Sequence, residues 1–126
     1  MEKIKLAVNG TLMRGFALNS NLLEAGAEFL SETSTAPAYR LWSINDAYPA
    51  MQRDEVSGRC IALEIWELSP DALIDLLNKE PPGLTLGRVE LSDGAWVLGI
   101  LGDGFICTGQ PEITAWGGWR EYINSR

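Results

Sequence analysis

Residues 59–68, RCIALEIWEL, constrain the fold more than any other segment, because apolar side chains occupy both of the alternating sets of positions. A strand with this pattern is buried on both faces, so it is expected in the middle of a sheet. Glu64 interrupts the apolar pattern on the face that also carries Trp66. We expect its carboxylate to pair with a buried arginine, Arg40 or Arg88, or else to orient a ligand.

The next segment predicts the best-defined helix of the chain, over residues 69–80. Ser69 is a suitable N-cap, Pro70 fits the first helical position, and Asp71 complements the positive end of the helix dipole. Pro81 ends the helix, since the residue before a proline is pushed out of helical backbone. The expected apolar stripe consists of Leu73, Ile74, Leu76 and Leu77.

The remaining segments predict a mostly β chain. Alternating or short apolar runs bounded by turn residues predict strands at 3–8, 27–35, 38–44, 84–91 and 95–101. The last two are expected to form a hairpin through the turn Ser92-Asp93-Gly94. A helical turn is expected within 16–26, a loop at 45–58, and a short strand with a last helical turn at 113–123. Residues 1–126 therefore predict one α+β domain, with a curved or closed sheet and one or two helices.

Charge and composition narrow the range of partners. The chain has 10 Lys and Arg against 17 Asp and Glu, a formal net charge of −7 at pH 7. That balance argues against nucleic acids and anionic membrane surfaces. No apolar run approaches the roughly 20 residues of a transmembrane helix. Cys60 and Cys107 are expected to be reduced core thiols of a cytoplasmic protein, and most of the tryptophans to be core residues.

The chain contains no histidine. A Ser-His-Asp or Cys-His nucleophile is therefore excluded, together with most zinc sites. No phosphate-binding loop of the Walker type is present, so neither a metal nor another cofactor is expected. If the protein is an enzyme, a carboxylate is the expected carrier of protons, with Lys or Tyr as the alternatives.

Glu80 is the carboxylate whose position is hardest to explain by structure alone. It follows the predicted helix, where a negative charge meets the negative pole of the helix dipole, and it precedes Pro81. The dipole and any burial would raise the pKa of its carboxyl group, as a general acid or base requires. The alternative is a solvated glutamate at a frayed helix end.

A second candidate is the turn that ends the first strand. Asn9-Gly10-Thr11 is either an ordinary strand-ending turn or a loop whose backbone amides hold a ligand. Arg14 follows closely and either binds an anionic group or is an ordinary surface arginine.

The order of these pieces resembles a known family. VNGTLMRG after the first strand, and ALEIWELSPDALIDLLNKE later, are similar to the loop and to the strand, helix and glutamate of the gamma-glutamylcyclotransferase-like fold. Within that superfamily the chain more closely resembles the C-terminal domain of allophanate hydrolase. The motifs that carry this likeness are LAVNGTLMRGFALN, TAPAYRLWSI, KEPPGLTLGRVEL and ITAWGGWREYI. The resemblance spans Leu6 to Ile123 and implies a small curved or closed β-barrel with flanking helices.

The resemblance also implies a chemistry. In allophanate hydrolase an amidase domain releases ammonia, and the C-terminal domain promotes decarboxylation of the resulting N-carboxycarbamate. By this resemblance Glu80 moves the proton, and the chain acts on a small anionic substrate together with a separate amidase. The implied substrate-binding residues are Asn9, Gly10, Thr11, Leu12, Arg14, Tyr39 and Arg40.

Two departures keep other functions open. Asn9 stands where true cyclotransferases have an aromatic residue, which disfavours cyclisation of a gamma-glutamyl amine. The chain also carries no Gly/Ser-rich amidase signature. Besides decarboxylation, the alternatives are a cyclotransferase and a non-catalytic module that binds small acids or docks on an amidase. The oligomeric state stays open, with a homodimer as one option.

Overall fold

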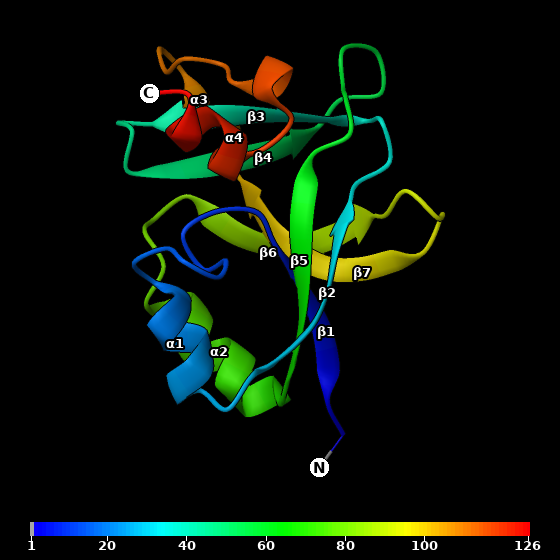
Figure 1. Cartoon of the computed structure of the whole chain (residues 1–126), viewed down its shortest axis with the longest axis vertical. Helices are drawn as coiled ribbons and strands as arrows, with labels where there is room; N and C mark the ends of the chain where they lie inside the picture. Colours follow the sequence, from blue (N-terminus) through cyan, green and yellow to red (C-terminus); the bar gives the residue numbers. More distant parts are fainter. Residues whose placement is uncertain (1) are drawn as a thin grey trace.

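A five-stranded sheet forms the centre of the molecule in the computed structural model, which describes residues 2–126 (Figure 1). In chain order the elements are β1 (Ile4–Val8), α1 (Asn19–Glu24), β2 (Glu28–Ser34), β3 (Tyr39–Ile44), β4 (Tyr48–Arg53), β5 (Ala62–Leu68), α2 (Pro70–Asn78), β6 (Leu84–Glu90), β7 (Trp96–Gly102), α3 (Gly104–Cys107), the 3-10 helix η1 (Thr114–Trp116) and α4 (Trp119–Asn124). The α+β class predicted from the sequence is confirmed.

The strand order of the sheet is β2-β5-β1-β7-β6. β5 pairs with β2 on one side and β1 on the other, both antiparallel, so the prediction that this strand lies inside a sheet is confirmed. β1 pairs with β7 in parallel, and β6 and β7 form the predicted hairpin. β2 and β6 are the outer strands of this sheet, and an isolated bridge between Thr35 and Leu91 links their ends, so closure of the sheet into a barrel is not confirmed.

A separate hairpin of β3 and β4 lies across one end of the molecule, beside η1 and α4, whereas α1 and α2 lie side by side toward the other end (Figure 1). The expected loop at 45–58 is therefore wrong, because it contains β4. Asn45 and Asp46 form the connecting turn with positive φ angles of 53° and 54°, which suits a hairpin turn. Pro49 is tolerated because β4 is an outer strand of a two-stranded sheet.

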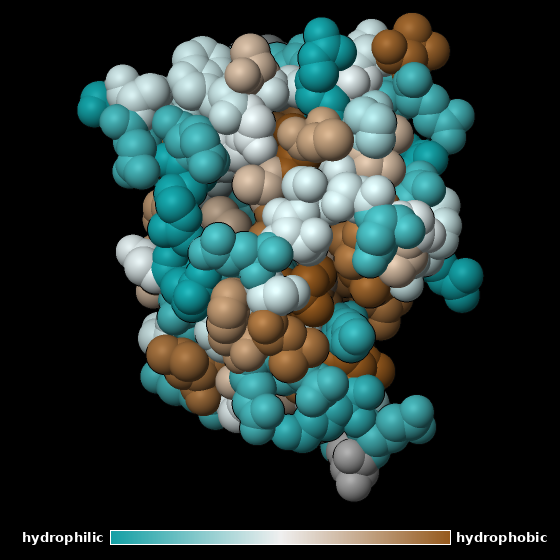
Figure 2. All heavy atoms as spheres, turned by 45° about the vertical axis from the view of Figure 1, so that its right-hand side comes forward, coloured by the Kyte–Doolittle hydropathy of each residue, from teal (hydrophilic) through white to brown (hydrophobic). Residues whose placement is uncertain are grey.

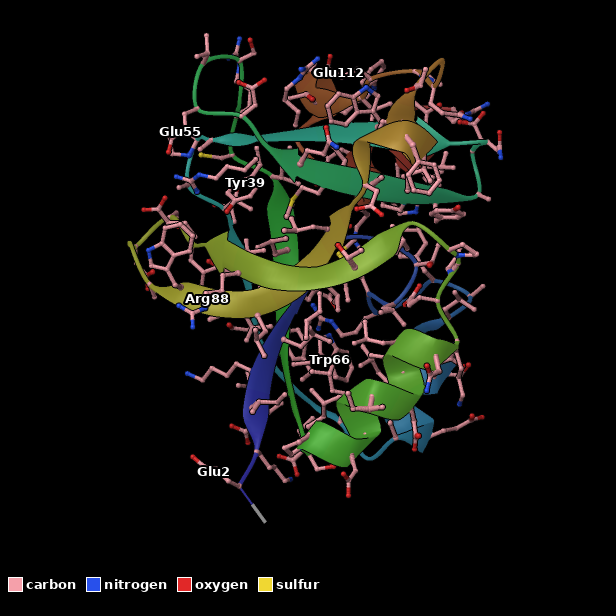
Figure 3. All side chains as sticks on the ribbon, turned by 180° about the vertical axis from the view of Figure 1, so that it is seen from behind. Glu2, Tyr39, Glu55, Trp66, Arg88 and Glu112 are labelled. Atoms are coloured by element: carbon pink, nitrogen blue, oxygen red, sulfur yellow. The ribbon has the colours of Figure 1, made fainter. Side chains whose placement is uncertain are left out.

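The helix α2 begins as its sequence predicts. The side chain of Ser69 accepts a hydrogen bond from the Ala72 amide at 3.2 Å, and Pro70 is the first helical residue. Leu73 is buried, but Ile74 is 57% exposed, so the expected apolar stripe is narrower than predicted. Buried α2 side chains cover the face of the sheet that carries Trp66 (Figure 3).

The opposite face of the sheet is not covered by these helices. Apolar side chains are visible near its middle in Figure 2, and a hollow of about 250 Å³ there has Leu30, Ile65 and Val97 in its lining. No helix within the described residues is long and apolar enough to cross a membrane.

Three smaller expectations are wrong. A 3-10 helix at Thr114–Trp116 takes the place of the expected short strand, whereas α4 confirms the expected last helical turn after the left-handed Gly117. Cys60 is exposed because it lies ahead of β5, although Cys107 is buried as expected. Trp96 and Trp116 are 53% and 43% exposed, so they are not core residues.

Candidate functional site

A small recess lies between the loop that follows β1 and Glu80, just after α2. Its cavity volume is about 20 Å³, enough for an ordered water molecule or one end of a small ligand. The lining residues are Val8, Asn9, Gly10, Thr11, Leu12, Tyr48, Pro49, Glu80, Leu84 and Ile100. The structure thus brings Glu80 and four of the predicted binding residues onto one surface.

The loop after β1 is held by its side chains and carbonyls. Nδ2 of the buried Asn9 donates to the carbonyl of Ile100 at 3.0 Å, which fixes the start of the loop beside β7. The carbonyl of Gly10 accepts from the Met13 amide at 2.9 Å, in a tight turn. A Cβ atom at Gly10 would collide with the ring of Pro49, so only glycine allows this approach.

The carbonyls of the loop accept hydrogen bonds within the protein, whereas three of its amides have no acceptor within the described residues. The Thr11 carbonyl accepts from the Leu18 amide at 3.1 Å, and the Leu12 carbonyl accepts from Nδ2 of Asn19 at 2.8 Å. The amides of Gly10, Thr11 and Leu12, by contrast, donate to no other group of residues 2–126. Successive amides without internal acceptors can bind an anion.

Glu80 lies just beyond α2, whose C-cap is Lys79. Its amide donates to the Leu77 carbonyl at 3.1 Å, so the backbone is still attached to the last helical turn. Burial raises the pKa of the Glu80 carboxyl group. In the described part of the chain this carboxyl group forms neither a salt bridge nor a hydrogen bond, and it is available to a ligand.

Arg14, Tyr39 and Arg40, which the resemblance implied as substrate-binding residues, do not line the recess. Arg40 forms salt bridges with Glu112 at 2.6 Å and Asp54 at 3.2 Å, which occupy its guanidinium group. Figure 3 shows Tyr39 and Glu112 at the end of the molecule formed by β3 and β4.

The hydroxyl group of Tyr39 is also occupied. Tyr39 is fully buried, and its oxygen accepts hydrogen bonds from Arg53 at 3.2 Å and from the Glu90 amide at 2.9 Å. Its contacts therefore join β3 to β6 instead of facing the recess.

Glu64 is buried, and its partners differ from the expected Arg40 and Arg88. It forms salt bridges with Arg14 at 3.2 Å and with Arg120 at 3.3 Å. Arg14 is therefore a partner of Glu64 and also of the exposed Glu32.

Sequence reasoning missed the residues that close the recess from the far side, Tyr48 and Pro49 on β4 and Ile100 on β7. The Asn45-Asp46 turn was the one available signal for β4, because Asn and Asp tolerate positive φ angles. Among residues 2–126 there is no group of three or more His, Cys, Asp or Glu side chains arranged to hold a metal ion.

Comparison with solved structures supports the fold. The chain superposes on c4763, a uropathogenic E. coli-specific protein, with a TM-score of 0.97 and 46% identity, over 100% of this chain and 99% of that one. An AIG2-like protein from Mus musculus matches 90% of this chain and 88% of its own, with a TM-score of 0.67 and 20% identity, which indicates the fold alone. This neighbour agrees with the predicted gamma-glutamylcyclotransferase-like fold.

Two further relatives are much longer proteins. Allophanate hydrolase from Kluyveromyces lactis matches 99% of this chain with a TM-score of 0.93 and 30% identity, but only 22% of its own length is covered. Urea amidolyase from Saccharomyces cerevisiae is 29% identical over 95% of this chain, which spans 7% of that relative's length. The family model of the allophanate hydrolase C-terminal domain matches residues 4–124. The chain therefore belongs to the allophanate hydrolase C-terminal domain family.

Proposed function

We propose that this chain promotes decarboxylation of N-carboxycarbamate, a small dianion with two carboxylates on one nitrogen. One observation carries the proposal: Glu80 and the loop amides of residues 10–12 line the same recess. Membership of the allophanate hydrolase C-terminal domain family supports the choice of substrate class.

The loop would bind one end of the substrate. A carboxylate oxygen entering the recess can accept hydrogen bonds from the amides of Gly10, Thr11 and Leu12, which have no acceptor within the described chain. The carbonyls of these three residues are already bonded elsewhere in the loop, so they do not oppose the negative charge.

Glu80 would supply the proton. As the bond between nitrogen and the departing carboxylate carbon breaks, its electron pair stays on nitrogen and the carbon leaves as carbon dioxide. Transfer of the Glu80 proton to that nitrogen gives carbamate, and water then returns a proton to Glu80. A pKa raised by burial keeps a larger fraction of the carboxyl group protonated near neutral pH.

An amidase would supply the substrate. The chain spans only a small share of its relatives allophanate hydrolase and urea amidolyase. The expected partner is therefore an amidase that releases ammonia from allophanate and passes on the carboxylated product.

The small volume of the recess favours one alternative, a module that binds the carboxylate end of a small acid without turning it over. The two functions differ in what they require of Glu80. Catalysis needs its proton, whereas binding by the loop amides does not.

The test is a coupled reaction. Allophanate is supplied to an isolated amidase domain, this protein is added, and the release of carbon dioxide and ammonia is followed. We expect acceleration that disappears in Glu80→Gln and persists in the control Glu24→Gln, which changes an exposed glutamate of α1. Acceleration by Glu80→Gln equal to that of the wild type would reject Glu80 as the proton donor, and no acceleration at all would reject this substrate.

A further inference from the structure

The loop that follows β1 and lines the recess, here called the recess loop, is fixed at its far end by Arg14. Both the amide and the carbonyl of Arg14 take part. The Arg14 amide donates to Oε1 of Glu64 at 3.0 Å. The Arg14 carbonyl accepts from Nη2 of Arg120 at 2.8 Å. Side chains from β5 and α4 therefore hold the peptide groups that follow the recess loop.

Glu64 is a firm anchor because it is itself fixed from several sides. Only 2% of the residue is exposed, and Oε1 also accepts from Nε1 of Trp66 at 3.1 Å. Oε2 accepts from Nε of Arg14 at 3.2 Å and from Nη2 of Arg120 at 3.3 Å. A buried carboxylate with these partners has little freedom to move, and removing it would leave two cationic side chains without their shared partner.

The recess loop depends on such anchors because its own amides hold nothing. Asn9 fixes the loop at its start, and Glu64 fixes it at Arg14. Between these points the amides of Gly10, Thr11 and Leu12 are unbonded within the described residues, so their direction follows from the two ends and from the carbonyl contacts.

We propose that Glu64 is a positioning residue that keeps the recess amides in their anion-binding arrangement, acting through the Arg14 backbone with the help of Arg120. This inference rests on the proposed function, since it assumes that the loop binds an anion. Glu64 does not line the recess and need not touch the ligand.

Glu32 offers a matched control. Its carboxylate also forms a salt bridge with Arg14, but only with the side chain, and it is exposed. Glu32→Gln therefore removes a negative partner of Arg14 and leaves the loop backbone attached. Glu64→Ala removes the backbone acceptor, whereas Glu64→Gln keeps an oxygen that can accept from the Arg14 amide.

The experiment uses malonate as the probe, because it is a stable dianion with CH₂ in place of the NH of N-carboxycarbamate. Calorimetric titration should show that Glu64→Ala weakens malonate binding at least about tenfold, since hydrogen bonds to an anion are lost when the amides are misdirected. We expect Glu64→Gln to recover most of the affinity and Glu32→Gln to bind like the wild type. Folded Glu64→Ala protein with unchanged affinity would overturn the proposal, as would equal losses in Glu64→Ala and Glu32→Gln.

A second readout separates this inference from the proposed function. Backbone order parameters of residues 10–12, measured by NMR without ligand, should fall in Glu64→Ala from about 0.85 toward about 0.6 and stay unchanged in Glu32→Gln. If the wild type does not bind malonate, the ligand assignment fails while the order parameters still test the anchor. If Glu64→Ala does not fold, Arg120→Met, which removes the donor to the Arg14 carbonyl and one partner of Glu64, should give a smaller loosening of residues 10–12, and unchanged order parameters there would reject the anchor.

Discussion

Pro49 packs against Gly10 so closely that the loop has no room for a Cβ atom at that position. The contact joins β4 to the loop after β1 and sets the position of the amides beside Glu80. Because these residues come from distant parts of the sequence, the recess exists only in the folded protein.

Gly10→Ala tests this contact. The added methyl group forces either Pro49 or the loop to move, so we expect a loss of about 1–3 kcal/mol in the free energy of unfolding and weaker malonate binding. Gly104→Ala is the control, because its nearest neighbour would be the flexible Gln52 side chain at 3.4 Å. Urea denaturation and calorimetry measure both effects, and wild-type values for Gly10→Ala would show that the loop is not confined by Pro49.

Glu80→Gln should change how stability depends on pH. Burial raises the pKa of Glu80 in the folded state, so its protonated form is favoured there more than in the unfolded chain. The contribution of Glu80 to stability is then fully present below the pKa of the unfolded chain, about 4.3, and is lost as the pH rises through the folded value.

The variant lacks this loss. The difference in the free energy of unfolding, Glu80→Gln minus wild type, should therefore increase as the pH rises above about 4.3 and then level off. Chemical denaturation at a series of pH values measures it. A difference that falls with rising pH would mean that the folded protein stabilises the charged form of Glu80.

Leu73→Ala should cost about 2–5 kcal/mol of stability, because the side chain is buried between α2 and the sheet. Ile74→Ala is the neighbouring control and should stay within about 0.5 kcal/mol, since Ile74 is largely exposed. Leu77 is only partly buried, so Leu77→Ala should fall between them. Urea denaturation measures these losses of stability. Equal losses for Leu73→Ala and Ile74→Ala would contradict the packing of the Leu73 face of α2 against the core.

Ser69→Ala should cost about 1 kcal/mol, because the Ala72 amide loses the side chain that caps it. Ser20→Ala changes an exposed serine of α1, a helix without a side-chain cap, and should be near neutral. Thermal unfolding of both variants checks the expectation, and equal melting temperatures would show that the cap contributes nothing.

Local signals predict much of this fold. Ser69 and Pro70 mark the start of α2, Pro81 marks its end, and the apolar pattern of 59–68 identifies the central strand. Each of these signals acts on neighbouring backbone, so the sequence alone carries it. β4 was missed because Pro49 reads as a strand breaker, and only its place in a two-stranded sheet makes it acceptable.

Contacts between distant residues are less accessible from the sequence. The role of Glu64 depends on Arg14 and Arg120, which lie 50 and 56 positions away, and no local pattern selects them over Arg40. Arg40 instead meets Glu112, 72 positions along the chain. The family resemblance predicts that the loop and Glu80 share a site. Only the structure shows that Arg14, Tyr39 and Arg40 lie outside the recess.

One NMR titration of labelled protein with malonate tests most directly whether the loop amides and Glu80 form a single site. We predict that the amide signals of Gly10, Thr11 and Leu12 and the carboxyl carbon of Glu80 shift together, with a single dissociation constant. Shifts of the loop amides without any response at Glu80, or shifts confined to another part of the molecule, would contradict a single site that joins them.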